Sequence, residues 1–226
     1  MPVKQKPVRA LYYNTVSPLL LDTLKKLMES EVFKPFRLVG GTCLSLQLGH
    51  RQSVDIDLFT DFEYSSIDFG SIEEYLKSNF TYTDSLNLPI IGMGKSFFIG
   101  ESFNHCVKLD VYYTDKFIRP TQFLDGLRLA ALEDIVAMKI VVISRGGRKK
   151  DFWDIHELLQ SYSLEYMLKV HEERNPYTHN RLEVLESLIN FEKADDDFEP
   201  LCLKNKNWQL IKLDLIEIVK ANNKAH

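Results

Sequence analysis

One stretch of the chain, "LVGGTCLSLQLGHRQSVDIDLF", restricts the fold more than any other. A short apolar segment ends in Gly40 and Gly41, a segment with a helical pattern follows, and the chain returns with Asp55 and Asp57 on either side of one isoleucine. Glycines at a strand end allow backbone conformations and a close ligand approach that a Cβ would block. Alternating apolar and acidic residues predict a strand with both carboxylates on one face. We therefore predict a strand, a turn, a short helix and a second strand.

The two carboxylates repel each other unless water or a cation lies between them. A pair of Mg²⁺ ions, which prefer carboxylate and phosphate oxygens, would relieve the repulsion and hold a phosphoryl group. Asp110, in the segment "VKLDVYY", is a third candidate ligand. Thr42 fits the N-cap of the helix after the glycines, whose free N–H groups suit a phosphate. A solvated strand face is the alternative for the aspartates, and a simple tight turn is the alternative for the glycines.

The first half of the chain alternates helical and extended patterns up to about residue 120. Ser17 and Pro18 precede the periodic segment "LLLDTLKKLMES", which predicts an N-capped helix. A further helix is predicted over "SIEEYLKSNF", and strands over "SFFIG" and "CVKLDVYY".

From Leu132 onward the pattern is helical almost throughout, over "LEDIVAMKIVVIS", "DFWDIHELLQ", "LEYMLKVHEER", "RLEVLESLIN" and "NWQLIKLDLIEIVKANN". The acidic segment "ADDDFEP" is predicted to be a solvated loop. Because the connector "RPTQFLDGLR" carries a proline and a glycine, we place a boundary near residue 125. The predicted fold class is α+β. An α/β head over residues 1–125, with a mixed sheet and flanking helices, precedes a helical region over residues 126–226 that closes over the site.

Composition excludes several classes of protein. With 226 residues and 45% apolar content the chain can bury a core, so overall disorder is excluded. The net charge of −4 and the pI near 5.9 argue against a protein that coats nucleic acid. The three cysteines form neither a metal-binding pattern nor an even disulfide set. No apolar run reaches the roughly 18 residues that span a bilayer, and the N-terminal residues lack an apolar signal segment, so we predict a cytoplasmic protein with no membrane partner.

The spacing of the glycines and aspartates is the most specific motif. Gly-Gly, thirteen further residues and then Asp-Ile-Asp-Leu resembles the signature of the DNA polymerase β-type nucleotidyltransferase superfamily. Together with "EDIVAMKIVVISRGGRKKDFWDIHELL", the same stretch resembles the AbiEii family of bacterial nucleotidyltransferase toxins. In that family the toxin is typically encoded beside an antitoxin, in systems linked to phage defence. The matched motifs span roughly residues 36–160, and the last sixty-odd residues carry no signature.

The resemblance implies a nucleotidyltransferase fold and a role for each matched residue. Gly40, Gly41 and Thr42 would contact the triphosphate of an NTP. Asp55 and Asp57 would bind the catalytic metals, two Mg²⁺ ions or Mn²⁺ in their place. The third strand carboxylate, which helps to deprotonate the attacking hydroxyl, would be Asp110. The remaining matched nucleotide-binding residues are Arg51, Lys139 and Asp154.

Lys139 interrupts a predicted helix that is otherwise apolar nearly all round. Residue chemistry alone favours a lysine that snorkels to the surface, whereas the resemblance implies one that holds the nucleotide phosphates. Asp151 and Asp154 share a face of the next helix, and their alternative role is that of helix N-terminal acids. The run "RGGRKKD" is by default a solvated loop. Beside a metal–triphosphate site it would guide a nucleotide or an RNA end, with Arg145 and Lys150 as candidates.

The combined prediction is an Mg²⁺-dependent nucleotidyltransferase. An acceptor hydroxyl attacks the α-phosphate of an NTP and pyrophosphate leaves. The resemblance implies an RNA 3′ end, in particular tRNA, as acceptor, and an antitoxin as protein partner. Two alternatives stay open: the same fold modifies a protein or small-molecule hydroxyl, or it is a catalytically idle binding module. Three intact acids weigh against the idle module, because a non-catalytic protein has no need to tolerate their repulsion.

Overall fold

The computed structural model describes residues 10–85 and 93–224. Within them a seven-stranded mixed sheet has the order β3-β4-β5-β2-β1-β7-β6. Its strands are β1 (Arg37–Leu38), β2 (Asp55–Thr60), β3 (Tyr82–Ser85), β4 (Gly94–Ser102), β5 (His105–Tyr113), β6 (Gln122–Leu124) and β7 (Leu127–Leu129). Residues 1–9, on which the prediction of a missing signal segment rests, lie outside the described residues.

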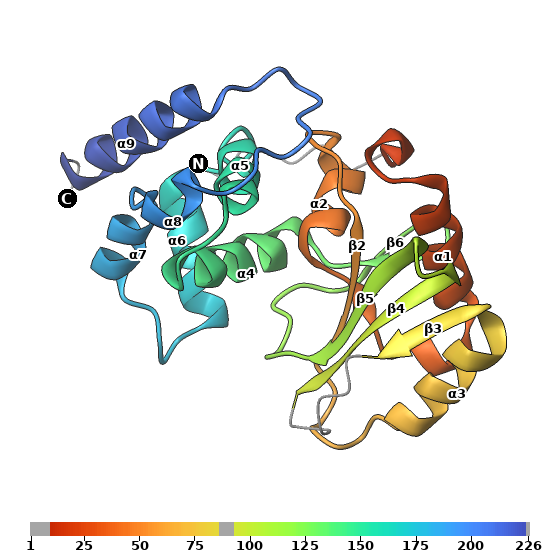
Figure 1. Ribbon diagram of the computed structural model, residues 1–226. Helices are drawn as coiled ribbons and strands as arrows, with labels where there is room; N and C mark the ends of the chain where they lie inside the picture. Colours follow the sequence, from red (N-terminus) through yellow and green to blue (C-terminus); the bar gives the residue numbers. More distant parts are fainter. Residues whose placement is uncertain (1–9, 86–92, 225–226) are drawn as a thin grey trace.

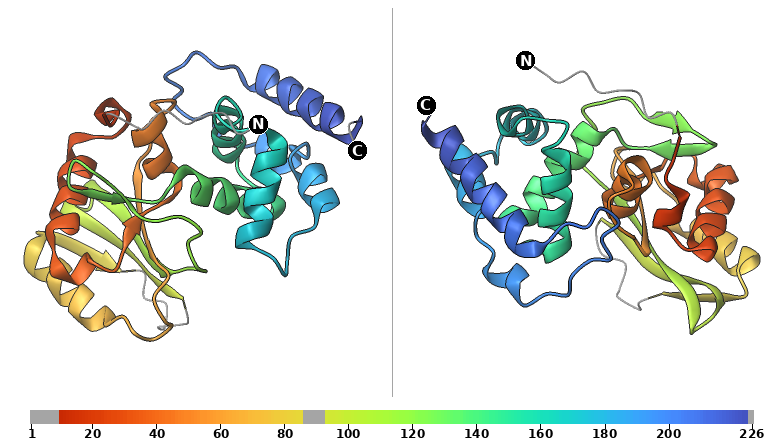
Figure 2. Two further views of the ribbon diagram at one scale, coloured as in Figure 1. Left: turned by 180° about the vertical axis from the view of Figure 1, so that it is seen from behind. Right: turned by 90° about the horizontal axis from the view of Figure 1, so that it is seen from above.

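The helices form two groups, one packed around the sheet and one in a separate helical half. The sheet half contains α1 (Pro18–Glu29), α2 (Gly40–Leu48) and α3 (Phe69–Asn79), with short 3₁₀ turns over Tyr13–Thr15 and Glu31–Phe33. The helical half, on the other side of the molecule (Figures 1 and 2), contains α4 (Leu132–Ser144), α5 (Lys149–Leu158), α6 (Leu164–Arg174), α7 (Arg181–Ser187), α8 (Glu192–Asp195) and α9 (Trp208–Lys224). No helix among the described residues is both long and apolar enough to cross a membrane.

Local sequence signals explain where several helices begin. The Ser17 side chain accepts a hydrogen bond from the Leu20 N–H and Pro18 is the first helical residue, as predicted for α1. The predicted helices over "LEDIVAMKIVVIS" and "LEYMLKVHEER" coincide with α4 and α6. The mixed sheet with flanking helices, followed by a helical region, confirms the predicted fold class.

The two central strands β2 and β5 run parallel and set the register of the acids. Asp57 pairs with Asp110, and Asp55 pairs with Lys108. Side chains alternate along β2, so that Ile56 is fully buried on one face while the aspartates on either side of it point to the other. The prediction that Asp55 and Asp57 share one face is confirmed.

Two features differ from the predictions. The connector after Pro120 holds the β6–β7 hairpin, and β7 pairs with β1 in the main sheet. The proposed boundary near residue 125 falls at the turn of this hairpin, and a division into two domains there stays a prediction. The prediction of a solvated loop over residues 194–200 is wrong in part, because Asp195 belongs to α8 and is paired with Lys212, and Asp197 is paired with Arg148.

Candidate active site

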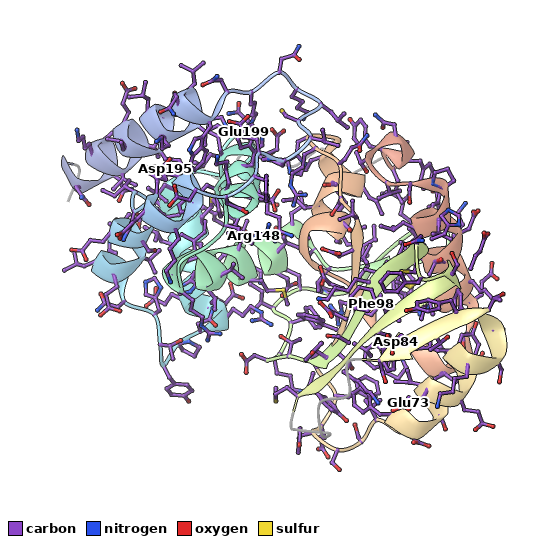
Figure 3. All side chains as sticks on the ribbon, viewed as in Figure 1. Glu73, Asp84, Phe98, Arg148, Asp195 and Glu199 are labelled. Atoms are coloured by element: carbon purple, nitrogen blue, oxygen red, sulfur yellow. The ribbon has the colours of Figure 1, made fainter. Side chains whose placement is uncertain are left out.

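A cavity of about 500 Å³ opens between the sheet and the helical half, at the start of α2. Its walls come from the β1–α2 turn, β2, α4, the α4–α5 loop and the first turn of α5. Arg148, at this loop, lies on the side of the helical half that faces the sheet (Figure 3). The lining residues are Val39, Gly40, Gly41, Ser53, Asp55, Asp57, Phe59, Ile135, Met138, Lys139, Val142, Arg145, Gly146, Gly147, Arg148, Lys150 and Asp151.

The two glycines allow the chain to turn closely over the strand below. Gly40 has a φ of +67°, in the left-handed region that favours glycine. A Cβ on Gly40 would lie 2.2 Å from Asp57 Oδ2, and a Cβ on Gly41 would lie 2.5 Å from Arg51 Nη2. Both distances are far inside van der Waals contact. Gly40 therefore allows the close approach of the α2 N-terminus to the acidic strand, and Gly41 leaves room for the Arg51 guanidinium.

Thr42 does not cap α2, and the prediction that it does is wrong. The helix begins at Gly40 with Val39 as its N-cap, so Thr42 lies inside the first turn. Its buried hydroxyl donates to the Asp55 carbonyl oxygen and lies 2.9 Å from Ser53 Oγ. Thr42 thus ties α2 to β2 from below the cavity, and the hydroxyl that lines the cavity is that of Ser53.

The carboxylates of Asp55 and Asp57 both line the cavity. Burial, with repulsion from Asp110 and Asp55, raises the pKa of Asp57 to about 6, although Lys139 and Lys150 oppose the shift. Two neighbouring carboxylates repel each other when both are charged, and a divalent cation between them removes this repulsion. The residues present therefore fit a Mg²⁺ ion, with Asp55 and Asp57 as the residues that would hold it.

Asp110 lies beside Asp57 but does not line the cavity. Ser96 Oγ donates to Asp110 Oδ1 at 2.6 Å, and Lys108 Nζ donates to Oδ2. Over residues 10–85 and 93–224, no group of three or more His, Cys, Asp or Glu side chains is gathered in a way that could hold a metal ion. A serine and a lysine thus bind the third carboxylate, and the role of Asp110 as a metal ligand stays a prediction.

Lys139 does not snorkel to the surface. Its side chain is 8% exposed, and its Nζ lies 2.6 Å from Asp151 Oδ1 and 2.7 Å from Asp154 Oδ2. Arg51 binds the same Asp154 through Nε at 2.7 Å and Nη2 at 2.8 Å, and His50 Nε2 lies 2.7 Å from Asp154 Oδ1. Two cations and two carboxylates thus form one buried network behind the cavity.

Only part of this network faces the cavity. Lys139 and Asp151 line it, whereas Arg51 and Asp154 lie beneath its wall. Burial would raise the pKa of Asp154, but Arg51 and Lys139 hold it well below its usual range. Burial would likewise lower the pKa of Lys139, but Asp154 and Asp151 raise it above its usual range, so Lys139 keeps its charge. We propose that Asp154 and Arg51 position the side chains of the site and that neither contacts the nucleotide.

The basic run over residues 145–150, which ends in the first turn of α5, is mostly engaged within the protein. Arg148 forms an ion pair with Asp197, with 3.0 Å between Nη2 and Oδ1. Lys149 is buried, and its Nζ lies over the Trp208 ring at 5.5 Å. Lys150 lines the cavity, where its Nζ lies 3.9 Å from Asp55 Oδ2. The default prediction of a solvated loop is therefore wrong for Lys149.

Sequence patterns missed the apolar wall of the cavity. Phe59 lies two residues beyond Asp57 on the same strand face, so the alternation of β2 could have revealed it. Ile135, Met138 and Val142 come from one face of α4 together with Lys139, at a spacing of three and four residues. An apolar wall beside charged groups suits a ligand with an aromatic and an ionic part.

The model of the family described as nucleotidyl transferase AbiEii toxin, type IV toxin–antitoxin system, matches residues 22–221. An uncharacterised protein of Aquifex aeolicus (strain VF5) is 29% identical over 192 residues, which cover 79% of this chain and 86% of that protein.

Two solved structures share the fold. A candidate nucleotidyltransferase from H. pylori superposes with a TM-score of 0.60 at 18% identity, over 92% of both chains. MenT4, a nucleotidyltransferase toxin from Mycobacterium tuberculosis H37Rv, superposes with a TM-score of 0.51 at 13% identity, over 89% of this chain and 83% of that chain.

Proposed function

The chain belongs to the family of AbiEii nucleotidyltransferase toxins of type IV toxin–antitoxin systems and is a nucleotidyltransferase; from this premise we propose that it transfers an NMP from an NTP to the 3′ end of an RNA. The observation that carries the proposal is the cavity itself. It combines the N-terminus of α2, where two glycines leave room for a ligand, with the Asp55–Asp57 pair and with Lys139 in one wall. Helix N–H groups and cations suit the triphosphate, and the paired carboxylates suit its metal.

In the proposed reaction the acceptor oxygen forms a bond to the α-phosphorus while the bond from that phosphorus to the β-phosphate oxygen breaks. Pyrophosphate leaves with the bonding electrons, and the hydroxyl proton passes to Asp110 or to water. Bound Mg²⁺ would supply charge neutralisation at the phosphates. The residues of the chain position the reactants. Gly40 and Gly41 admit the phosphates, Asp55 and Asp57 hold the metal, and the apolar wall of α4 receives the base.

Gly40→Ala is expected to lower transfer by at least about tenfold, because the added Cβ collides with the Asp57 carboxylate. Gly126→Ala is the matched control, since Gly126 also has a positive φ, +79°, but nothing lies within 4 Å of an added Cβ. Both variants should lose about 1 kcal/mol through backbone strain. Thermal melts and single-turnover assays compare them. Equal activity in the two variants would contradict the close approach of Gly40 to the acidic strand.

An RNA acceptor is supported by charge at the cavity. The protein is acidic overall, yet Arg145, Arg148 and Lys150 line the opening. Arg148 is held by Asp197 at 3.0 Å, whereas Lys150 lies at the longer distance of 3.9 Å from Asp55, so Arg145 and Lys150 are the cations for an approaching phosphate backbone. RNA binding should thus be weak, with a salt dependence of about two phosphates. An RNA acceptor would also place the reaction in the cytoplasm, and the type IV family predicts an antitoxin partner.

The acceptor is tested with each labelled NTP, Mg²⁺, and either purified tRNA or a cell extract. Label is expected in tRNA, and Arg145→Gln with Lys150→Gln should reduce tRNA labelling at least about threefold more than NTP binding. Arg181→Gln is a control, because Arg181 pairs with Glu165 on the helical half. If tRNA accepts no label while a protein in the extract does, the protein-modifying alternative replaces the RNA proposal.

A further inference from the structure

Lys108 lies on the acidic strand face, beside Asp110 on β5 and opposite Asp55 on β2. It precedes Asp110 by two residues on β5, so the two side chains point to the same face of the sheet. Across the strand pair, Lys108 is in register with Asp55, and Asp110 is in register with Asp57. One lysine and three carboxylates therefore occupy four neighbouring positions of two parallel strands.

The ammonium of Lys108 binds the carboxylate of Asp110, which lies beside the proposed metal ligand Asp57. Lys108 Nζ donates to Asp110 Oδ2, and Ser96 Oγ donates to the other oxygen of that carboxylate at 2.6 Å. Asp55 and Asp57 also act electrostatically on the same ammonium. A metal ion held by Asp57 and Asp110 would compete with the Lys108 ammonium for the Asp110 carboxylate.

We propose that Lys108 is a built-in counter-cation of the acidic face, which holds Asp110 in the nucleotide-free protein and competes with the divalent cation for this carboxylate. The inference rests on the proposed function, because it requires the metal site at Asp55 and Asp57. Lys108 neutralises the repelling carboxylates when no metal is bound. Asp110, once released from Lys108, can bind the cation and accept the proton of the acceptor hydroxyl.

This competition makes metal binding depend on what else enters the cavity. A nucleotide brings phosphate oxygens as further metal ligands, so metal and NTP together displace Lys108 more readily than metal alone. Free Mg²⁺ should thus bind the nucleotide-free protein weakly. Lys108 is a positioning residue in this role, since it acts through Asp110.

The test is Mn²⁺ binding to the nucleotide-free protein, measured by electron paramagnetic resonance of the free ion. Lys108→Met is expected to bind Mn²⁺ at least about tenfold more tightly than the wild type, because it removes a charge-assisted hydrogen bond to the ligand. Lys150→Met is the matched control. Lys150 also faces Asp55, at 3.9 Å, and its side chain is 35% exposed against 36% for Lys108, but it does not touch Asp110.

The control separates competition from a general change in charge. Lys150→Met should shift Mn²⁺ affinity by less than about threefold, and Lys108→Arg, which keeps the charge, should leave it at or below the wild-type value. Equal Mn²⁺ affinity in Lys108→Met and the wild type, absence of binding in both included, would overturn the proposal. Equal tightening in Lys108→Met and Lys150→Met would overturn it as well. Asp57→Asn tests the metal site separately. If this variant binds Mn²⁺ as tightly as the wild type does, the metal site at Asp55 and Asp57 is wrong, and the proposed function fails with it.

Discussion

Asp57→Asn is expected to reduce nucleotidyl transfer by about a thousandfold or more while the protein stays folded. Asp57 lines the cavity beside Asp55, and an amide in its place donates where a metal ligand must accept. Asp55→Asn should have a similar effect. Growth arrest on expression should also require Asp57, if transfer is what harms the cell. The measurement is initial rate with labelled NTP, alongside thermal melting of the same preparation.

The metal-free protein should become more stable in the Asp57→Asn variant, and the gain should depend on pH. Burial and the neighbouring acids raise the pKa of Asp57 from 3.8 to about 6, so the folded state holds this proton more tightly than the unfolded state. The wild type therefore loses stability as pH rises from about 4 to about 6. Asparagine carries no charge, so the gain, on the order of 2 kcal/mol, is expected at pH 7.5 and not at pH 4.

Asp84→Asn is the matched control for this variant, since Asp84 is an exposed acid on β3, at the edge of the sheet (Figure 3). It should change neither transfer nor melting by a measurable amount. Transfer by Asp57→Asn at the wild-type rate would contradict the assignment of Asp57 as a metal ligand. A gain in stability that is equal at pH 4 and pH 7.5 would contradict the electrostatic explanation of that gain.

Periodicity predicted the strands and helices that bury a regular face. The alternation around Ile56 located β2 and the shared face of its two aspartates, because strand geometry alone decides that placement. The hairpin β6–β7 was missed, since its strands have three residues each and are joined by a turn at Asp125 and Gly126. Strands this short carry too little alternation to be distinguished from a loop.

The partners of charged side chains were harder to predict than their positions. Nothing local in the sequence shows that Arg51 and Lys139 meet on Asp154, because the three residues come from separate elements that only tertiary packing brings together. The same is true of Thr42, whose buried hydroxyl finds the Asp55 carbonyl across the α2–β2 contact. By contrast, the proximity of Lys108 and Asp110 follows from their spacing on one strand, and that signal was overlooked.

The buried network around Lys139 leads to the second large effect. Lys139→Ala is expected to lower the free energy of unfolding by about 3 kcal/mol or more, because it leaves the charges of Asp151 and Asp154 with Arg51 as their remaining buried cation. For a chain of this size the melting temperature should fall by about 10 °C. Lys150→Ala, which removes a half-exposed lysine from the same cavity, should cost less than about 1 kcal/mol.

A paired substitution distinguishes lost charge balance from a lost phosphate contact. Asp151→Asn removes the unbalanced charge and keeps an oxygen for the Arg148 N–H, which Asp151 Oδ2 accepts at 2.9 Å. Lys139→Ala with Asp151→Asn should thus recover most of the lost stability, whereas NTP affinity should stay low, because the cation of the cavity wall is still absent. Urea unfolding and NTP titration measure the two properties separately. Recovery of NTP affinity together with stability would mean that Lys139 supports the wall and does not bind phosphate. If stability stays low in the double variant, the packing of the lysine stem, and not its charge, holds α4 to α5.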